Sequence, residues 1–141
     1  MAFRFNPTTG QLDIAFDDST GESSLIVTLN CDASVYVGAA VYLGVGDIAF
    51  NAIADDISTS LVFGFAISKP TATTCRVRVA GITENIFSGI TEGSQYFLSD
   101  NVAGEISTSI PTTSGYVIAP LGTALTDQTI AIAIQARMKR A

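Results

Sequence analysis

Acidic side chains come closest to a catalytic or metal-binding pattern in this chain of 141 residues. Two pairs of carboxylates are adjacent in the sequence, Asp17-Asp18 and Asp55-Asp56. Neighbouring residues of a strand point to opposite faces of a sheet, so neither pair converges on one site. Loop carboxylates can bind Ca²⁺, but the Asp-x-Asp-x-Asp-Gly spacing of a calcium loop is absent. Solvated turns are therefore the better interpretation of both pairs.

The absence of histidine excludes much of the remaining chemistry. Without His, the chain cannot form a Ser-His-Asp or Cys-His relay. Two cysteines, Cys31 and Cys75, are too few for a four-thiolate zinc site. We expect both to be reduced and buried as small apolar side chains, while a disulfide between them stays an open alternative. The sequence thus predicts a protein that is not an enzyme and has no metal and no cofactor.

The charge of the chain bears on its partners. A net charge of -6 argues against binding to a nucleic-acid backbone. Three of the seven basic residues, Arg137, Lys139 and Arg140, stand at the C-terminal end, where a solubilising end is a better interpretation than a phosphate-binding tail. The longest uncharged apolar stretch, 35–46, is much shorter than the ~20 residues of a membrane helix. With no signal-peptide pattern at the start, we expect no membrane contact and folding in the cytosol.

The elements that would position any site are predicted to be strands. Residues 74–79 (TCRVRV) and 129–135 (TIAIAIQ) alternate apolar and other residues with the period of two of a half-buried strand. Residues 25–29 (LIVTL) and 61–65 (LVFGF) are short runs of bulky, strand-favouring residues. Turn-forming residues cluster at 44–47, 68–73, 99–104 and 111–115. No amphipathic helix is predicted, although 51–60 could form one helical turn.

An internal similarity suggests how the strands are organised. Gly38 and Gly93, which are 55 residues apart, each precede an apolar stretch that contains an aromatic residue and then a turn. Gly64 and Gly122 match at a spacing of 58. We interpret these as two similar β units, about 37–79 and 92–134. The two units are expected to pack together, because neither could bury its apolar face alone. The predicted fold is all-β, a compact β-sandwich or β-barrel-like domain over 25–141.

The first 24 residues differ from the two units. FRFNPTTGQLD gives a short aromatic strand, a turn with Asn-Pro and Gly, and the start of a second strand. The polar run DDSTGESS that follows is typical of a linker. We therefore predict that residues 1–24 form an N-terminal arm or hairpin and a linker.

The segment 90–125, ITEGSQYFLSDNVAGEISTSIPTTSGYVIAPLGTAL, resembles a small β module of tailed-bacteriophage virion proteins. Its pattern is Gly93, an aromatic-Leu-Ser triplet within 96–99, Gly104, a Thr-rich strand, Pro111 and a hydrophobic-Gly-x-Ala-Leu ending at 121–125. The start, FRFNPTTGQLD, is similar to a short opening segment of such proteins. The whole chain also resembles the small proteins that decorate phage capsids.

This resemblance implies a structural virion protein, a cement protein made in the bacterial cytoplasm and bound to the outer capsid surface. Its implied partners are the lattice of the major capsid protein and further copies of itself, as a dimer or trimer. The composition agrees, because 14% charged and 48% hydrophobic residues suit a surface that a partner covers. The predicted docking residues are Phe3, Arg4, Phe5, Asn6, Pro7, Arg137, Lys139 and Arg140. The alternative is a tail-fibre or baseplate-associated module that binds a receptor or glycan through exposed aromatic side chains.

Overall fold

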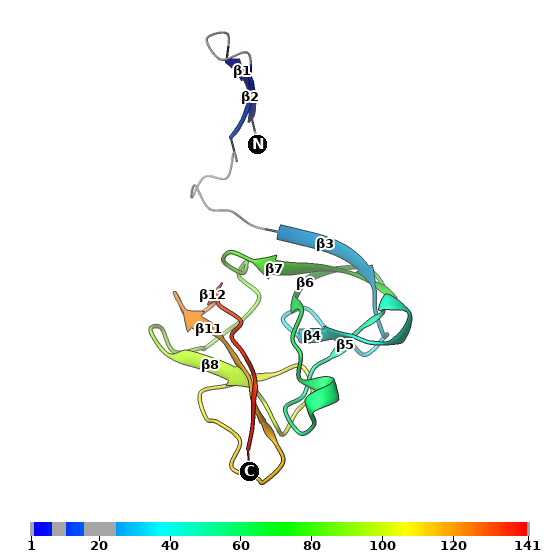
Figure 1. Cartoon of the computed structure of the whole chain (residues 1–141), viewed down its shortest axis with the longest axis vertical. Coiled ribbons are helices and arrows are strands. Elements are labelled where there is room, and N and C mark those ends of the chain that lie inside the picture. Colours follow the sequence, from blue (N-terminus) through cyan, green and yellow to red (C-terminus); the bar gives the residue numbers. More distant parts are fainter. Residues whose placement is uncertain (1, 7–10, 16–24, 141) are drawn as a thin grey trace.

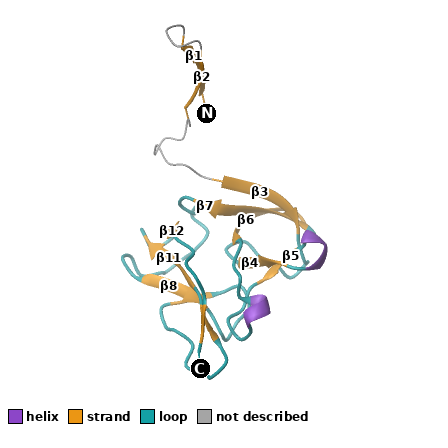
Figure 2. Ribbon diagram, viewed as in Figure 1, coloured by secondary structure: helices purple, strands orange, loops and turns teal. Residues whose placement is uncertain are grey.

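The computed structural model describes the backbone of residues 2–6 and 11–15 and the whole of residues 25–140 (Figure 1). Its regular elements are antiparallel strands and two short 3₁₀ turns, so the fold is all-β and sandwich-like, as predicted (Figure 2). Among the described residues, no helix has the length and apolar character needed to cross a membrane.

The larger sheet has five strands in the order β3-β7-β6-β4-β5. An isolated bridge between Cys31 and Ala49 brings the end of β3 to β5, where the Asp32 amide donates to the Ala49 carbonyl at 2.9 Å. The two edges of the sheet therefore meet at this end, which makes it barrel-like. The strands are β3 (Leu25–Asn30), β4 (Ala40–Leu43), β5 (Ala49–Asn51), β6 (Gly64–Thr71) and β7 (Thr74–Ala80).

The smaller sheet has four strands in the order β12-β11-β8-β9. A bridge between Ile82 and Ala131 adds one further paired residue beyond β12. Ile82 therefore lies beside β12 in the same way as β3 lies beside β7 in the larger sheet. The strands are β8 (Gln95–Leu98), β9 (Ile106–Ser107), β11 (Pro120–Ala124) and β12 (Ile130–Ile132).

Two further pairs and two turns complete the described elements. β10 pairs with β13, which is the C-terminal strand, and β1 pairs only with β2 among the described strands. The 3₁₀ turns η1 and η2 follow β4 and β5 respectively. Their bounds are β1 (Ala2–Asn6), β2 (Gln11–Ala15), η1 (Val45–Asp47), η2 (Ile57–Thr59), β10 (Val117–Ile118) and β13 (Met138–Lys139).

The first pair of repeated glycines, Gly38 and Gly93, form corresponding hydrogen bonds in the two sheets. The Gly38 amide donates to the Ala66 carbonyl at 2.7 Å, and the Gly93 amide donates to the Ala124 carbonyl at 2.8 Å. Both glycines have positive φ angles, 95° and 82°. Only glycine adopts this conformation readily, so both strand starts need it.

The second pair of repeated glycines occupies matched positions in the strand ladders. Gly64 of β6 pairs with Val41 of β4, and Gly122 of β11 pairs with Tyr96 of β8. At each glycine the neighbouring strand on the other side comes so close that a Cβ atom would lie within 2.5 Å of a carbonyl oxygen. The close approach of backbones excludes any larger residue there.

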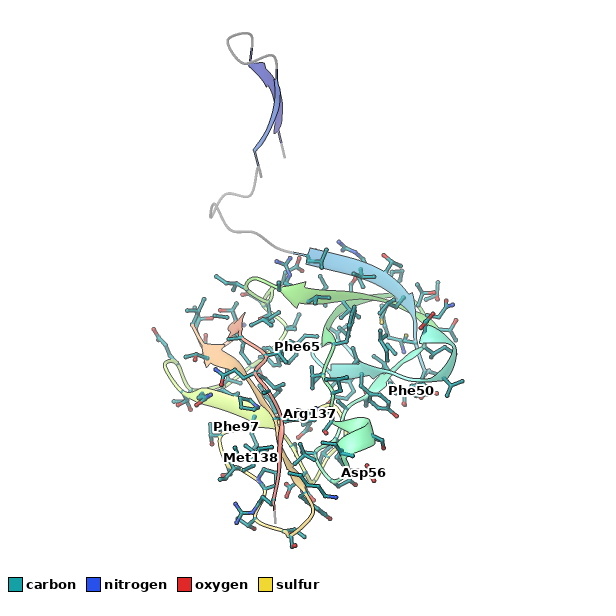
Figure 3. All side chains as sticks on the ribbon, in the orientation of Figure 1. Phe50, Asp56, Phe65, Phe97, Arg137 and Met138 are labelled. Atoms are coloured by element: carbon teal, nitrogen blue, oxygen red, sulfur yellow. The ribbon has the colours of Figure 1, made fainter. Side chains whose placement is uncertain are left out.

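The main core is shared by both sheets. Phe65 of β6 and Leu121 of β11 are fully buried in it, together with Leu98 of β8. The Phe65 ring packs edge-to-face against Phe87 at 5.7 Å, and it lies inside the β domain in Figure 3. Separate smaller clusters serve the five-stranded sheet alone and the four-stranded sheet alone. The shared core is therefore what joins the two sheets.

Three local predictions need correction. The predicted strand over 61–65 starts only at Gly64, and Leu61 is 60% exposed. The turn predicted at 68–73 is shorter, because β6 continues to Thr71 through Pro70. Proline is tolerated there because the pairing of β6 with β7 is irregular between Ser68 and Thr71. The strand predicted over 129–135 is confined to β12.

Candidate docking site

An apolar groove lies on the β domain between β4, η2 and the C-terminal segment. It consists of three hollows of about 300, 440 and 570 Å³, and neighbouring hollows share lining residues. Among the described residues, no carboxylate lines any of the three. The apolar groove is defined by Tyr42, Leu43, Val45, Leu61, Phe63 and Ile134.

Several apolar side chains of the groove are open to solvent. Val45 is 94% exposed, Leu61 is 60% exposed and Leu43 is 38% exposed. Val45 and Leu43 are exposed because β4 leaves the core at its end and passes into η1. Adjacent exposed apolar residues of this kind typically mark an interaction surface rather than a site of chemistry.

Sequence reasoning missed the groove. Leu61 and Phe63 belong to a run that the sequence predicts only as strand-favouring, since a short apolar run has the same pattern whether it faces a core or a surface. The one available signal was the high apolar content of the chain, which indicated a covered surface without locating it.

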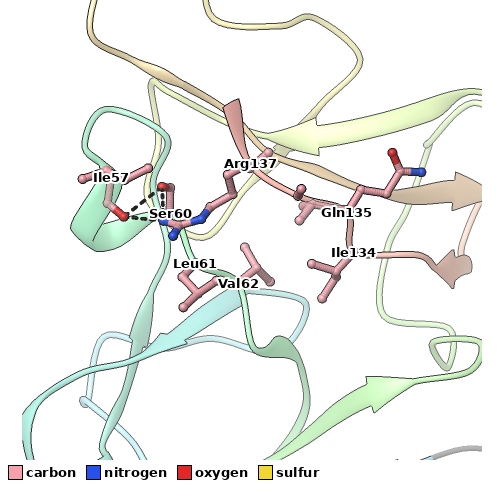
Figure 4. Close-up of a pocket in the computed structure, with 10 residues that line it drawn as sticks. Ile57, Ser60, Leu61, Val62, Ile134, Gln135 and Arg137 are labelled. Carbon is pink, nitrogen blue, oxygen red and sulfur yellow. Dashed lines mark hydrogen bonds between the residues drawn. The ribbon is translucent and has the colours of Figure 1, made fainter. Parts of the chain in front are cut away.

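Arg137 closes one end of the groove by a contact within the chain. Its guanidinium donates to the Ile57 carbonyl and, at 3.1 Å, to the Ser60 hydroxyl (Figure 4). Ser60 is fully buried, so Arg137 ties the C-terminal segment to η2. This predicted docking residue is thus engaged inside the fold.

Replacement of Arg137 by alanine measures how much its hydrogen bonds to Ile57 and Ser60 contribute to stability. We expect Arg137→Ala to lower the free energy of unfolding by about 1–2 kcal/mol, because the hydrogen bonds of a charged donor are lost. Urea denaturation followed by circular dichroism would measure this. Lys139→Ala is the matched control and should change stability by less than about 0.5 kcal/mol. Equal effects of the two substitutions would contradict the assigned role of Arg137.

The other two basic residues of the C-terminal segment lie in or beside β13. Lys139 is exposed and its backbone pairs with Val117 of β10. The Arg140 amide donates to the Tyr116 carbonyl at 2.7 Å, and its own carbonyl accepts from the Gly115 amide at 2.9 Å. The basic end is therefore fixed to the β domain as an additional strand, and Lys139 keeps its side chain in solvent.

Four of the predicted N-terminal docking residues, Phe3, Arg4, Phe5 and Asn6, lie in β1. The register sets Phe3 opposite Ile14 and Arg4 opposite Asp13 of β2. The fifth, Pro7, lies outside the described residues. The described pairing places Phe3 to Asn6 in the sheet β1-β2 and Lys139 in a different two-stranded sheet, β10-β13, with Arg140 directly after β13.

The carboxylates of the described residues form no cluster that could hold a metal ion. No group of three or more potential metal ligands is found among those residues, and Asp17-Asp18 lies outside them. Asp56 instead caps η2, since its carboxylate accepts from the Ser58 amide at 2.8 Å and the Ser58 hydroxyl at 2.9 Å. These hydrogen bonds, led by the one from the amide, hold the pKa of Asp56 below its ordinary value of 3.8.

This cap predicts a pH dependence at the acid end. Because the pKa of Asp56 is lower in the folded than in the unfolded chain, its contribution to stability is present above about pH 4 and is lost as pH falls through the folded pKa. The difference in unfolding free energy between the wild type and Asp56→Ala should therefore be constant from about pH 5 to 7 and shrink below pH 4. Urea denaturation at a series of pH values would show this. A difference that does not change with pH would contradict it.

The two cysteines are both buried and both free. Burial raises the pKa of Cys75, and the neighbouring Cys31 raises it further, to about 12. The Cys75 thiol therefore stays protonated at neutral pH, and a protonated, buried thiol is a poor nucleophile.

Comparison with known proteins adds no relative: no protein-family model, curated protein or solved structure matches the chain.

Proposed function

We propose that this protein is a structural component of a bacteriophage virion, a non-enzymatic cement protein that decorates and stabilises the capsid. The observation that carries the proposal is the apolar groove, with exposed Val45 and Leu61 and with no carboxylate among the described residues that line it. Covering such a surface with a partner is favourable by ~25 cal/mol per Å² of buried apolar area, before the costs of association are subtracted.

The proposed partner is the lattice of the major capsid protein, bound through the N-terminal hairpin and the apolar groove. An isolated two-stranded hairpin is marginally stable in water, and β1-β2 pairs with no other described strand. Docking on a capsid would supply the missing packing surface. The net charge of -6 then keeps decorated particles mutually repulsive.

Deletion of residues 1–16 tests the role of the hairpin. We expect the truncated protein to lose binding to bare, expanded capsids by at least tenfold, about 1.4 kcal/mol. Its β domain should keep the circular dichroism spectrum and melting behaviour of the full chain, because the described residues of the shared core all lie within 40–134. Co-sedimentation with capsids gives the binding, and retained binding by a folded truncation would refute the role of the hairpin.

The apolar groove is tested in the same assay by Val45→Asp, which places a charge at a lining position that is 94% exposed. Val102→Asp is the matched control, because Val102 is 43% exposed but does not line the groove. We expect only the first variant to bind capsids more weakly and to raise the capsid melting temperature less than the wild type.

A second candidate function is a receptor- or glycan-binding module of a tail fibre or baseplate. One observation favours it: the rings of Tyr42 and Phe50 stack with their centroids 5.7 Å apart, and both residues line the largest of the three hollows of the groove. Sugar rings bind to aromatic faces of this kind. Binding of the isolated protein to host cells or glycans, without binding to capsids, would favour this alternative.

A further inference from the structure

The edge of β3 is the longest strand edge without a described partner. β3 contains six residues and pairs only with β7 among the described strands. The other outer strands of the two larger sheets, β5, β9 and β12, have two or three residues each, and β1 and β2 have five each. In Figure 1, β3 lies along the margin of the β domain with β7 on its inner side. A long open edge offers unpaired amides and carbonyls to another strand.

The direction of the backbone groups follows from two hydrogen bonds just after β3. The Cys31 amide donates to the Thr73 carbonyl, on the β7 side, at 2.8 Å. The Asp32 amide donates in the opposite direction, to Ala49. Because these directions alternate along an antiparallel strand, the amides and carbonyls of Ile26, Thr28 and Asn30 point away from β7.

The side chains of β3 do little to block another strand. The strand has no charged residue and no proline, which are the usual means of protecting an edge. Its one irregularity lies at its start, between Leu25 and Ile26. Leu25 is 53% exposed, and Ile26, Val27 and Leu29 are partly exposed. A partner strand would cover apolar side chains as well as satisfy backbone groups.

We propose that β3 pairs antiparallel with β3 of a second copy of this chain, about a twofold axis at Thr28. In that register the outward groups of Thr28 meet those of Thr28 in the second copy, and the groups of Ile26 meet those of Asn30. Val27 of one copy then lies beside Leu29 of the other. An uncharged strand opposes itself without repulsion, and a twofold contact closes the open edge in both copies.

Substitutions of Thr28 that add a charge or allow cross-linking test this interface without any capsid. Thr28→Lys should shift the full-length protein from dimer to monomer in sedimentation velocity at micromolar concentration, because two lysines meet at the axis. The exposed Arg76 of β7, which pairs with Thr28, adds to that repulsion. Thr28→Pro, which removes an outward amide but no bond to β7, should weaken the dimer at least tenfold.

Thr28→Cys should form a disulfide-linked dimer under mild oxidation, since hydrogen-bonded antiparallel partners have Cα atoms about 5.5 Å apart. Thr123 is the matched control, because it is exposed on β11 between β8 and β12 and has no open edge. Thr123→Lys should remain a dimer, and Thr123→Cys should not cross-link.

A wild-type monomer or trimer would overturn the proposal, as would a Thr28→Lys dimer that is as stable as the wild type. A dimer that is lost on deletion of residues 1–16 but kept in Thr28→Lys would assign the contact to the N-terminal segment instead. None of these results depends on capsid binding, so the dimer and the decorating function can fail separately.

Discussion

Replacement of Phe65 by alanine should destabilise the whole β domain by about 3–5 kcal/mol, the cost typical of removing a large aromatic side chain from a core. Phe65 is fully buried in the core that both sheets share, and its ring packs edge-to-face against Phe87, which reaches that core from the loop before β8. We therefore expect one cooperative urea transition at lower denaturant concentration, in which both sheets unfold together.

The matched control keeps most of the apolar volume. Phe65→Leu should cost less than half as much as the alanine substitution, because the cavity is smaller. Circular dichroism in urea measures both. Two separate transitions would show that the sheets fold independently, and a loss below about 1 kcal/mol for Phe65→Ala would show that the shared core does not join them.

Gly64→Ala should cost about 3 kcal/mol through a clash rather than a cavity. A Cβ atom at this position would lie 2.4 Å from the Arg78 carbonyl oxygen and 2.7 Å from a methyl of Val77. Both atoms belong to β7, the neighbouring strand, so β6 and β7 would have to move apart. Gly122→Ala should behave alike, since its Cβ atom would lie 2.2 Å from the Ala131 carbonyl oxygen.

Gly89→Ala separates this clash from the cost of backbone conformation. Gly89 has a φ of 70°, but no atom lies within 4 Å of a Cβ built there. Gly89→Ala should therefore lower the free energy of unfolding by only about 1–2 kcal/mol, which is the cost of a non-glycine residue in the left-handed conformation. Equal losses at Gly64 and Gly89, in thermal or urea unfolding, would show that the close approach of β6 and β7 has no energetic consequence.

The all-β fold was predictable because strand periodicity is a local property of the sequence. In β7 the alternation of TCRVRV was sufficient: Cys75 and Val77 are buried, and Arg76 between them is exposed. The pattern could not reveal the bridge between Cys31 and Ala49, because that contact depends on how the whole sheet curves.

The candidate site was less predictable, since it depends on contacts between distant residues. Arg137 contacts Ile57, which is 80 residues earlier in the chain, and no local pattern announces such a bond. Charge alone suggested a solubilising or docking role for the basic end. The exposure of Leu61 was likewise hidden, because its apolar neighbours Val62 and Phe65 are buried.

The location of the protein in purified phage particles tests the central proposal most directly. Gold-labelled antibodies and electron microscopy of intact virions, with protein quantification in separated heads and tails, would measure it. The proposal predicts many copies on the outer surface of the head. Label confined to the tail, or no copies in the particle, would contradict it.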